Sequence, residues 1–375
     1  MRIAFVGLRG VPAAYSGVER AVEEIGCRLA SRGHDITVFC MSHHFERRPV
    51  THRGMLLKYV PSIRSNSLEM ITHAFLATLS TLTGRYDVMH FHALGPSTLS
   101  FLPRLFGKQT VVTVHGLDWK REKWGALARA YLRFGEAASC RFPDATIVVS
   151  EVLRDHYAAK YEADTVYIPN GVPTSEHKVL RRAGEIGELR AREYILFVGR
   201  LTPEKNVHQL IRAFRRLNTT KNLVIVGGAG HLTEYGRQLD ELAALDSRVL
   251  LAGQRYGEVV SELLSNAYLY VLPSSLEGLP IALIEALSFG VPALVSDIPE
   301  NLEVITHGGA KCAFVFQAGS EDRLHDALET LINRPESMLE IGRLGQTAVR
   351  AKYDWDAITD ATETLYSRLA ASAPA

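Results

Sequence analysis

Two glutamates stand at the ends of a short, otherwise uncharged stretch of the sequence, "EGLPIALIE". Pro280 suits the first turn of a helix, where its missing N–H costs nothing. Glu277 is therefore predicted to precede a helix, and Glu285 to lie about five residues inside it. Five helical residues span roughly 7 to 8 Å. Two carboxylates at that separation can flank a ligand, or they can be the exposed edges of a buried helix.

The start of this predicted helix is also suited to an anion. The amides of Gly278, Leu279 and Ile281, with the positive end of the helix, are expected between the two carboxylates. A phosphate site with a hydrogen-bond acceptor on each side suits a ligand with hydroxyls on both sides of a diphosphate, such as a nucleotide sugar. A glutamate inside an apolar helix has a desolvation cost unless it has partners.

A second candidate group is the pair of cations in "RLTPEKN", which follows the apolar run "YILFVG". Arg200 offers a planar fork of donors and Lys205 a compact charge, a combination that suits a diphosphate. A solvated basic loop is the alternative interpretation.

Two further candidates follow apolar runs in the first half of the chain. His115 comes directly after "TVVTV", where an imidazole can hydrogen-bond a hydroxyl or polarise a leaving group. Gly17 lies in "GLRGVPAAYSGVE", whose glycine spacing differs from the GxGxxG pattern and so disfavours a dinucleotide site. A glycine at a helix start lets a ligand approach the backbone. A structural histidine and a turn glycine are the alternatives.

Strands and helices that would position these residues alternate along the whole chain. Continuous apolar runs are typical of parallel strands covered on both faces. Strands are predicted near residues 2–7, 36–40, 56–60, 87–92, 110–116, 145–150, 194–199, 222–228, 248–253, 268–274 and 291–296, with helices between them, among them 67–83, 97–106, 119–138 and 151–161. Such alternation predicts an open parallel sheet, which binds ligands at the carboxyl ends of its strands.

A charged segment containing proline and glycine interrupts this alternation near its middle. The sequence therefore predicts an α/β protein with two facing Rossmann-like domains. The expected parts are a first domain at 1–172, a linker at 173–192, a second domain at 193–352 and a terminal segment at 353–375.

Composition narrows the class of protein. The net charge of the 375 residues is +1, which gives no indication of nucleic-acid binding. Residues 1–172 hold 21 Lys and Arg against 15 Asp and Glu, whereas the remainder holds 21 against 26. The positive excess in the first half favours an anionic partner. A solvated basic surface is the alternative. Four scattered cysteines, no signal-like start and no long apolar run predict a cytoplasmic protein.

The ordered motifs resemble a known enzyme family. "EGLPIALIE" is similar to the E-x7-E motif of retaining glycosyltransferases of family 4, which have the GT-B fold. The motifs "TVHGLDWKREKW", "IPNGV", "FVGRLTPEKN" and "FGVPALVSDIPENLEV" occur in the family's order, so the resemblance covers nearly the whole chain. Ser16 stands where many relatives have the first of two glycines. The resemblance implies a cleft between the two domains and a terminal segment that crosses back to the first domain.

The resemblance also implies roles for the candidate residues. Glu277 would contact hydroxyls of the donor sugar, Glu285 would hold the ribose, and Gly278, Leu279, Pro280 and Ile281 would lie near the sugar and diphosphate. Arg200 and Lys205 would stabilise the leaving diphosphate, Gly17 would lie against it from the first domain, and His115 would contact the donor sugar.

The function implied is metal-independent transfer of a sugar, with retention, from a nucleotide-diphosphate donor to a saccharide, lipid-linked or small-molecule hydroxyl. The bacterial branch that it resembles assembles polysaccharides and cell-surface glycans. No metal and no cofactor is expected, and the sequence has no DxD in a suitable post-strand loop. An epimerase or phosphorylase on the same fold, and a non-catalytic nucleotide-sugar-binding protein, are the alternatives.

Peripheral contact with an anionic membrane is a separate hypothesis. The stretch 119–134, "WKREKWGALARAYLRF", interleaves aromatic and basic residues, a pattern suited to a helix lying on a bilayer. An ordinary amphipathic helix with a solvated basic face is the alternative.

Overall fold

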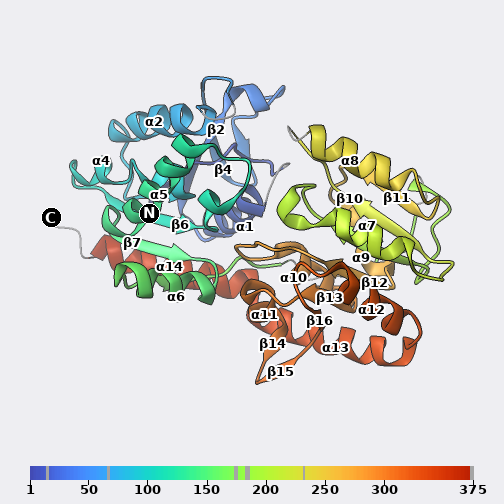
Figure 1. The fold of residues 1–375 in the computed structure, drawn as a ribbon. Coiled ribbons are helices and arrows are strands. Elements are labelled where there is room, and N and C mark those ends of the chain that lie inside the picture. Colours follow the sequence, from blue (N-terminus) through green and yellow to red (C-terminus); the bar gives the residue numbers. More distant parts are fainter. Residues whose placement is uncertain (14–16, 66–67, 173–175, 182–185, 231–232, 372–375) are drawn as a thin grey trace. The chain divides into compact units, whose positions relative to one another are not determined.

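The computed structural model describes residues 1–13, 17–65, 68–172, 176–181, 186–230 and 233–371, and Ser16 lies outside them. The chain divides into two units (Figure 1). Unit 1 comprises Met1–Gly171 and Trp355–Ala375, and unit 2 comprises Val172–Asp354. No helix in the described part of the chain is long and apolar enough to cross a membrane.

The sheet of unit 1 has eight strands in the order β3-β4-β2-β1-β5-β6-β7-β8. All neighbours are parallel except the short pair β3 and β4. The strands are β1 (Arg2–Val6), β2 (Asp35–Met41), β3 (Thr51–His52), β4 (Met55–Val60), β5 (Val88–His92), β6 (Gln109–Val114), β7 (Ala145–Val148) and β8 (Val166–Tyr167). The central strand β1 is buried from Ile3 to Val6, as expected for a sheet with helices on both faces.

The helices of unit 1 connect these strands. They are α1 (Gly17–Ser31), η1 (Ser42–His44), α2 (Glu69–Leu82), α3 (Leu94–Ser97), α4 (Phe101–Arg104), η2 (Asp118–Lys120), α5 (Ala126–Arg141), α6 (Glu151–Tyr161) and α14 (Trp355–Ala371). The prediction of one helix over 97–106 is wrong, because two short helices occupy residues 94–104. The prediction of one helix over 119–138 is also wrong, since Gly125 is extended and α5 begins after it.

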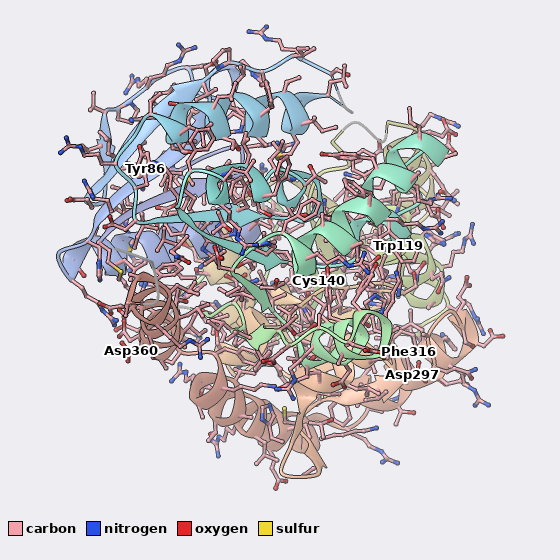
Figure 2. All side chains as sticks on the ribbon, turned by 90° about the vertical axis from the view of Figure 1, so that its left-hand side faces the viewer. Tyr86, Trp119, Cys140, Asp297, Phe316 and Asp360 are labelled. Carbon is pink, nitrogen blue, oxygen red and sulfur yellow. The ribbon has the colours of Figure 1, made fainter. Side chains whose placement is uncertain are left out.

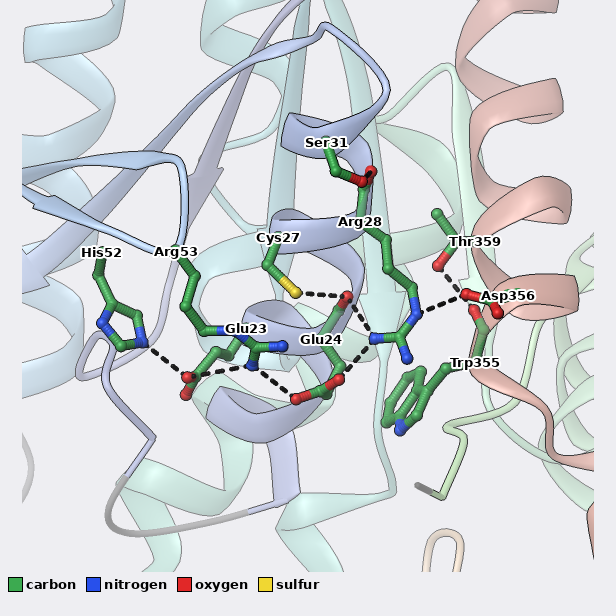
Figure 3. A network of polar contacts seen from close by, with 10 residues as sticks. All are labelled: Glu23, Glu24, Cys27, Arg28, Ser31, His52, Arg53, Trp355, Asp356 and Thr359. Carbon is green, nitrogen blue, oxygen red and sulfur yellow. Dashed lines mark hydrogen bonds and ion pairs between the residues drawn. The ribbon is translucent and has the colours of Figure 1, made fainter. Parts of the chain in front are cut away.

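The terminal helix α14 packs on α1 within unit 1. Trp355 and Tyr366 are fully or almost fully buried in the same core cluster as strand β1. Ion pairs join α14 to α1 and to the residue that follows α1. Arg28 Nε lies 2.8 Å from Asp356 Oδ1 (Figure 3), and Arg32 lies 2.7 Å from Glu363. The last helix of the chain therefore completes the core of the first unit.

The main sheet of unit 2 has six parallel strands in the order β11-β10-β9-β12-β13-β16. They are β9 (Tyr194–Val198), β10 (Asn222–Val226), β11 (Val249–Gly253), β12 (Leu269–Leu272), β13 (Ala293–Ser296) and β16 (Phe314–Phe316). A separate antiparallel pair joins β14 (Thr306–His307) and β15 (Ala310–Lys311). The two parallel sheets confirm the predicted fold class, with a Rossmann-like arrangement in each unit.

The helices of unit 2 lie between its strands. They are η4 (Pro203–Lys205), α7 (Val207–Arg215), α8 (Thr233–Ala243), α9 (Glu258–Asn266), α10 (Ile281–Ser288), α11 (Pro299–Ile305), α12 (Glu321–Ile332) and α13 (Pro335–Lys352). The described residues of the predicted linker belong to this unit, because the amide of Arg181 donates to Glu262 of α9 at 2.9 Å and that of Arg192 donates to the Asn266 carbonyl at 2.8 Å.

Candidate functional site

The carboxyl ends of β9 and β12 mark the point in unit 2 where the strand order reverses. The chain runs outward from β9 to β10 and β11, then returns to β12 beside β9 and continues to β13 and β16. Open parallel sheets bind ligands at such a point, because the loops that follow the two strands diverge there. Lys205 follows β9 and Glu277 follows β12, so the topology brings both to this position.

The Lys205 ammonium donates a hydrogen bond to the Glu277 carboxylate. Their side chains are 15% and 8% exposed, so the ion pair is largely withdrawn from water. In such surroundings a charge interacts more strongly with its partner than it does in bulk solvent. The pair therefore supplies one oriented cation and one oriented acceptor at the switch between β9 and β12.

Backbone contacts hold these two groups in place. Asn206 adopts a left-handed conformation (φ 52°) that ends η4, and its side-chain amide donates to the Pro273 carbonyl at 3.0 Å. The amide of Ser275 donates to the Glu204 carbonyl at 2.8 Å. The turn after β9 is thus fastened to the loop after β12, which fixes the approach of Lys205 to Glu277.

Helix α10 begins one residue later than predicted. Pro280 precedes the helix, and its carbonyl accepts the amides of Leu283 and Ile284 at 3.0 and 3.2 Å. The Ile281 amide donates to the Leu279 carbonyl at 2.9 Å, so it is already engaged.

Two of the three amides assigned to an anion remain available. Those of Gly278 and Leu279 donate to no other group within the described ranges. Glu285 is half-buried as the fifth residue of α10. The start of α10 therefore combines two available amides with carboxylates before and within the helix.

Arg200 and Tyr270 complete the surroundings of this site. Arg200 lies in the same post-strand loop as Lys205, but its side chain is exposed. The Tyr270 hydroxyl is buried and donates to the Val198 carbonyl at 3.3 Å. Burial, together with the charges of Glu277 and Glu285, raises the pKa of Tyr270 well above its usual range. The charges of both carboxylates therefore reach this one buried phenol.

Unit 1 has an equivalent reversal of strand order between β1 and β5. Gly7 follows β1 with φ +92°, and a Cβ there would lie 2.7 Å from the His92 carbonyl oxygen. Only glycine allows this close approach. Gly17 is the first residue of α1, and the residues immediately before it lie outside the described part.

His115 lies in a small pocket of unit 1 whose lining includes His90, His92, Thr113 and Asn170. Its Nε2 atom is 3.1 Å from His92 Nδ1. Burial lowers the pKa of His115 to about 4 and that of His92 well below its usual value, so both rings are neutral at pH 7.

The outer nitrogens of these two rings, His115 Nδ1 and His92 Nε2, are buried without a hydrogen-bond partner in the described part of the chain. Leaving such atoms unpaired costs about 1–3 kcal/mol each, so a bound hydroxyl or water is expected at the pocket.

The chain matches two protein families. Residues 15–176 match Glycosyltransferase Family 4, and residues 184–347 match Glycosyl transferases group 1. These matches fall largely on the two Rossmann-like units, and they include Gly17, His115, Arg200, Lys205, Glu277 and Glu285. The chain is a GT4-like glycosyltransferase.

Named relatives match all or part of the length of the glycosyltransferase. It is 26% identical over 401 residues to an alpha-maltose-1-phosphate synthase of Mycolicibacterium smegmatis, a match that covers 99% of this chain and 100% of the relative. It is 27% identical over 252 residues to the O-antigen chain mannosyltransferase of Salmonella typhimurium, covering 66% and 67% of the two chains.

Solved structures share the GT-B fold of the glycosyltransferase. Sucrose-phosphate synthase from Thermosynechococcus elongatus superimposes with a TM-score of 0.84 at 22% identity, covering 99% of both chains. Anabaena HepE in complex with UDP-glucose superimposes with a TM-score of 0.79 at 18% identity, covering 98% of this chain and 100% of HepE.

Three residues of these sites were not predicted from the sequence. Asn206 could have been found, because asparagine after a short charged turn is a common signal for a left-handed residue. Tyr270 and His92 lie inside strands, where an aromatic side chain normally signals core packing. Their proximity to Glu277 and His115 depends on strand pairing, which local sequence does not specify.

The Lys205–Glu277 pair gives the first testable prediction. Lys205→Ala and Glu277→Ala should each lower kcat/KM for sugar transfer about a hundredfold or more, because each removes an oriented polar group of the candidate site. Lys205→Ala should also lower the thermal unfolding midpoint, since it leaves a buried carboxylate unpaired.

The double variant separates activity from stability. Lys205→Ala/Glu277→Ala should recover part of the unfolding midpoint while activity stays low. Lys221→Ala is a matched control, because Lys221 forms another ion pair of unit 2, 3.1 Å from Glu193, outside this site. Near-normal transfer by either single variant would contradict the assignment.

Proposed function

We propose that this glycosyltransferase moves a hexosyl group, with retention of configuration and without a metal ion, from a nucleotide-diphosphate sugar to a hydroxyl acceptor. The observation that carries the proposal is the Lys205–Glu277 pair beside the start of α10, at the β9/β12 switch. A cation, available amides and two carboxylates are the groups that a diphosphate between two sugars requires.

Each residue has a distinct role in this proposal. Lys205, with Arg200 from the same loop, neutralises the diphosphate and stabilises it as it departs. Gly278 and Leu279 donate amides to the phosphate or sugar oxygens. Glu277 accepts from hydroxyls of the donor sugar, and Glu285 from the ribose.

The reaction proposed is a front-face substitution. The bond between the anomeric carbon and the diphosphate oxygen breaks, and an oxocarbenium-like species forms. The acceptor hydroxyl attacks from the face that the diphosphate leaves, and its proton passes to the departing phosphate. Catalysis then depends on charge stabilisation and positioning, which fixed donors such as Lys205 supply without reorganisation.

Unit 1 contributes recognition of hydroxyl groups in this account. His115 and His92 are neutral, so each can donate one hydrogen bond and accept another. We assign His115 to the donor sugar, and Gly17 to the approach of the diphosphate to α1. The alternative of a purely structural His115 would leave its Nδ1 atom unpaired in the described part of the unit.

The relatives support a role in bacterial polysaccharide or cell-surface glycan synthesis. Their names include a maltose-1-phosphate synthase and an O-antigen mannosyltransferase, and HepE binds UDP-glucose. A saccharide or lipid-linked hydroxyl is therefore the acceptor class that we propose. All four cysteines are free thiols, in keeping with the cytoplasmic site that we propose for the reaction.

Product stereochemistry tests this proposal. A thermal-shift screen against UDP-, GDP-, ADP- and dTDP-sugars first selects the donor, which stabilises the folded protein. Proton NMR of the product should then show the anomeric configuration of the donor. The transfer rate after treatment with EDTA should stay within twofold of the untreated rate. An inverted product, or activity that returns only when Mg²⁺ or Mn²⁺ is added, would contradict the proposal.

We also propose peripheral contact with anionic membrane, through part of the predicted stretch 119–134 together with Phe101 of α4. Trp119, which is labelled in Figure 2, is half-buried, and its Nε1 atom donates to the buried Glu136 at 2.8 Å. The exposed large apolar residues of α5 are Leu127 and Phe134, at 87% and 54%, and α4 contributes Phe101. Phe101 and Phe134 both contact the Phe142 ring, so they form one patch beside basic α5 residues.

Vesicle flotation measures this contact. The wild-type chain should float with vesicles containing phosphatidylglycerol and should not float with phosphatidylcholine vesicles. Leu127→Ser/Phe134→Ser should lower the bound fraction at least about fivefold, because each side chain buries apolar area in the bilayer. Leu245→Ser, at a residue of unit 2 that is 63% exposed, is the control. Equal flotation with the two kinds of vesicle would contradict membrane contact. Equal flotation of the wild-type chain and the double variant would also contradict it.

A further inference from the structure

A cluster of two histidines and a glutamate lies in unit 1, apart from every residue used above. His43 and His44 belong to η1, which follows β2, and Glu69 is the first residue of α2. The Nε2 atoms of His43 and His44 lie 2.6 and 3.0 Å from the same oxygen, Glu69 Oε1. The three side chains are 14%, 18% and 20% exposed, so an ion can reach them from solvent.

The spacing of these atoms suits a small cation. One ligand atom from each residue lies within 4.8 Å of the others. A tetrahedral zinc site has bonds of about 2.1 Å, which places its ligand atoms about 3.4 Å apart. The present separations of 2.6 and 3.0 Å would have to open by less than about 1 Å to reach that value.

The second nitrogen of His43 has a partner of the kind found behind metal ligands. Its Nδ1 atom lies 3.3 Å from the hydroxyl of Ser62. Such a contact fixes the orientation of the ring, so that Nε2 is directed at Glu69. Among the described residues, this is the group of histidine, cysteine and carboxylate side chains whose ligand atoms converge in this way.

We propose that His43, His44 and Glu69 bind one divalent transition-metal ion, with Zn²⁺ as the ion that the ligands suit best. Two imidazoles and one carboxylate are a ligand set known for zinc, with water at the remaining position. Mg²⁺ and Ca²⁺ are excluded on chemical grounds, because they take oxygen ligands. The ion would tie the end of β2 to the first turn of α2.

Arg9 opposes this binding and so provides a direct test. Its guanidinium is close enough to act on the charges of both His44 and Glu69. A positive charge near a site for a dication lowers the affinity of that site. Replacing Arg9 by glutamine should therefore strengthen metal binding, whereas an ordinary hydrogen-bonded cluster would show no such response.

The inference does not rest on the proposed transfer reaction. The ligands belong to unit 1, whereas Lys205 and Glu277 belong to unit 2. Metal binding would stabilise unit 1, because the ion binds the folded arrangement of its ligands in preference to the unfolded chain. An enzyme that fails to retain configuration could still bind the ion, and an enzyme that transfers sugar as proposed could fail to bind it.

Calorimetry with Zn²⁺ on the chelator-treated full chain tests the proposal. The wild-type chain should bind one ion, and His44→Ala and Glu69→Gln should each weaken binding at least tenfold. Arg9→Gln should strengthen it severalfold. His52→Ala is the matched control and should change nothing, because His52 pairs with Glu23 at 2.7 Å outside this cluster.

The visible spectrum of the Co²⁺ form identifies the ligands. It should show the bands of four-coordinate cobalt without the charge-transfer bands of a thiolate, since no cysteine belongs to the cluster. Thermal unfolding should confirm that Glu69→Gln remains folded, as expected for a substitution that keeps the size of the side chain. Absence of stoichiometric binding, or binding that His44→Ala and Glu69→Gln leave unchanged, would overturn the proposal.

Discussion

The ion pair between Lys205 and Glu277 is the interaction on which the candidate site of this glycosyltransferase depends. Withdrawing two charges from water is costly, and their mutual attraction offsets this cost only when further hydrogen bonds support the pair. Here the support comes from Asn206 and from the Ser275 amide, which fasten the two loops together. The pair is thus a poor source of stability but an effective way to hold a cation and an acceptor in one fixed arrangement.

Both units place polar residues at the carboxyl ends of neighbouring parallel strands. In unit 2 the site follows β9 and β12, and in unit 1 His92 ends β5 and His115 follows β6. The chemistry differs between the two. Unit 2 presents opposite charges, whereas unit 1 presents neutral imidazoles whose pKa values burial has lowered. In the function that we propose, the charges of unit 2 serve the diphosphate and the uncharged donors of unit 1 serve hydroxyl groups.

The sequence predicted the strands of both sheets well, because parallel strands buried on both faces are continuous apolar runs. It failed for β3, β8 and β16, which have two or three residues each and too little sequence for a pattern. It placed Lys205 and Glu277 in loops that follow strands, but it did not show that they pair. The role of Tyr270 was missed for the same reason, because it depends on which strands are neighbours, and that order is set by the whole fold. Asn206 was missed although an asparagine after a short charged turn is a sequence signal for a left-handed residue.

The central claim is that Glu277 serves the sugar end of the donor and Glu285 the nucleotide end. Calorimetric dissociation constants for the selected nucleotide sugar and for its nucleoside diphosphate, measured on wild type, Glu277→Ala and Glu285→Ala, test it directly. The account predicts that Glu277→Ala reduces the gain in affinity that the sugar provides, whereas Glu285→Ala weakens both ligands equally and leaves that gain unchanged. The claim is contradicted if the sugar adds as much affinity in Glu277→Ala as in the wild type. It is also contradicted if Glu285→Ala abolishes the affinity that the sugar adds.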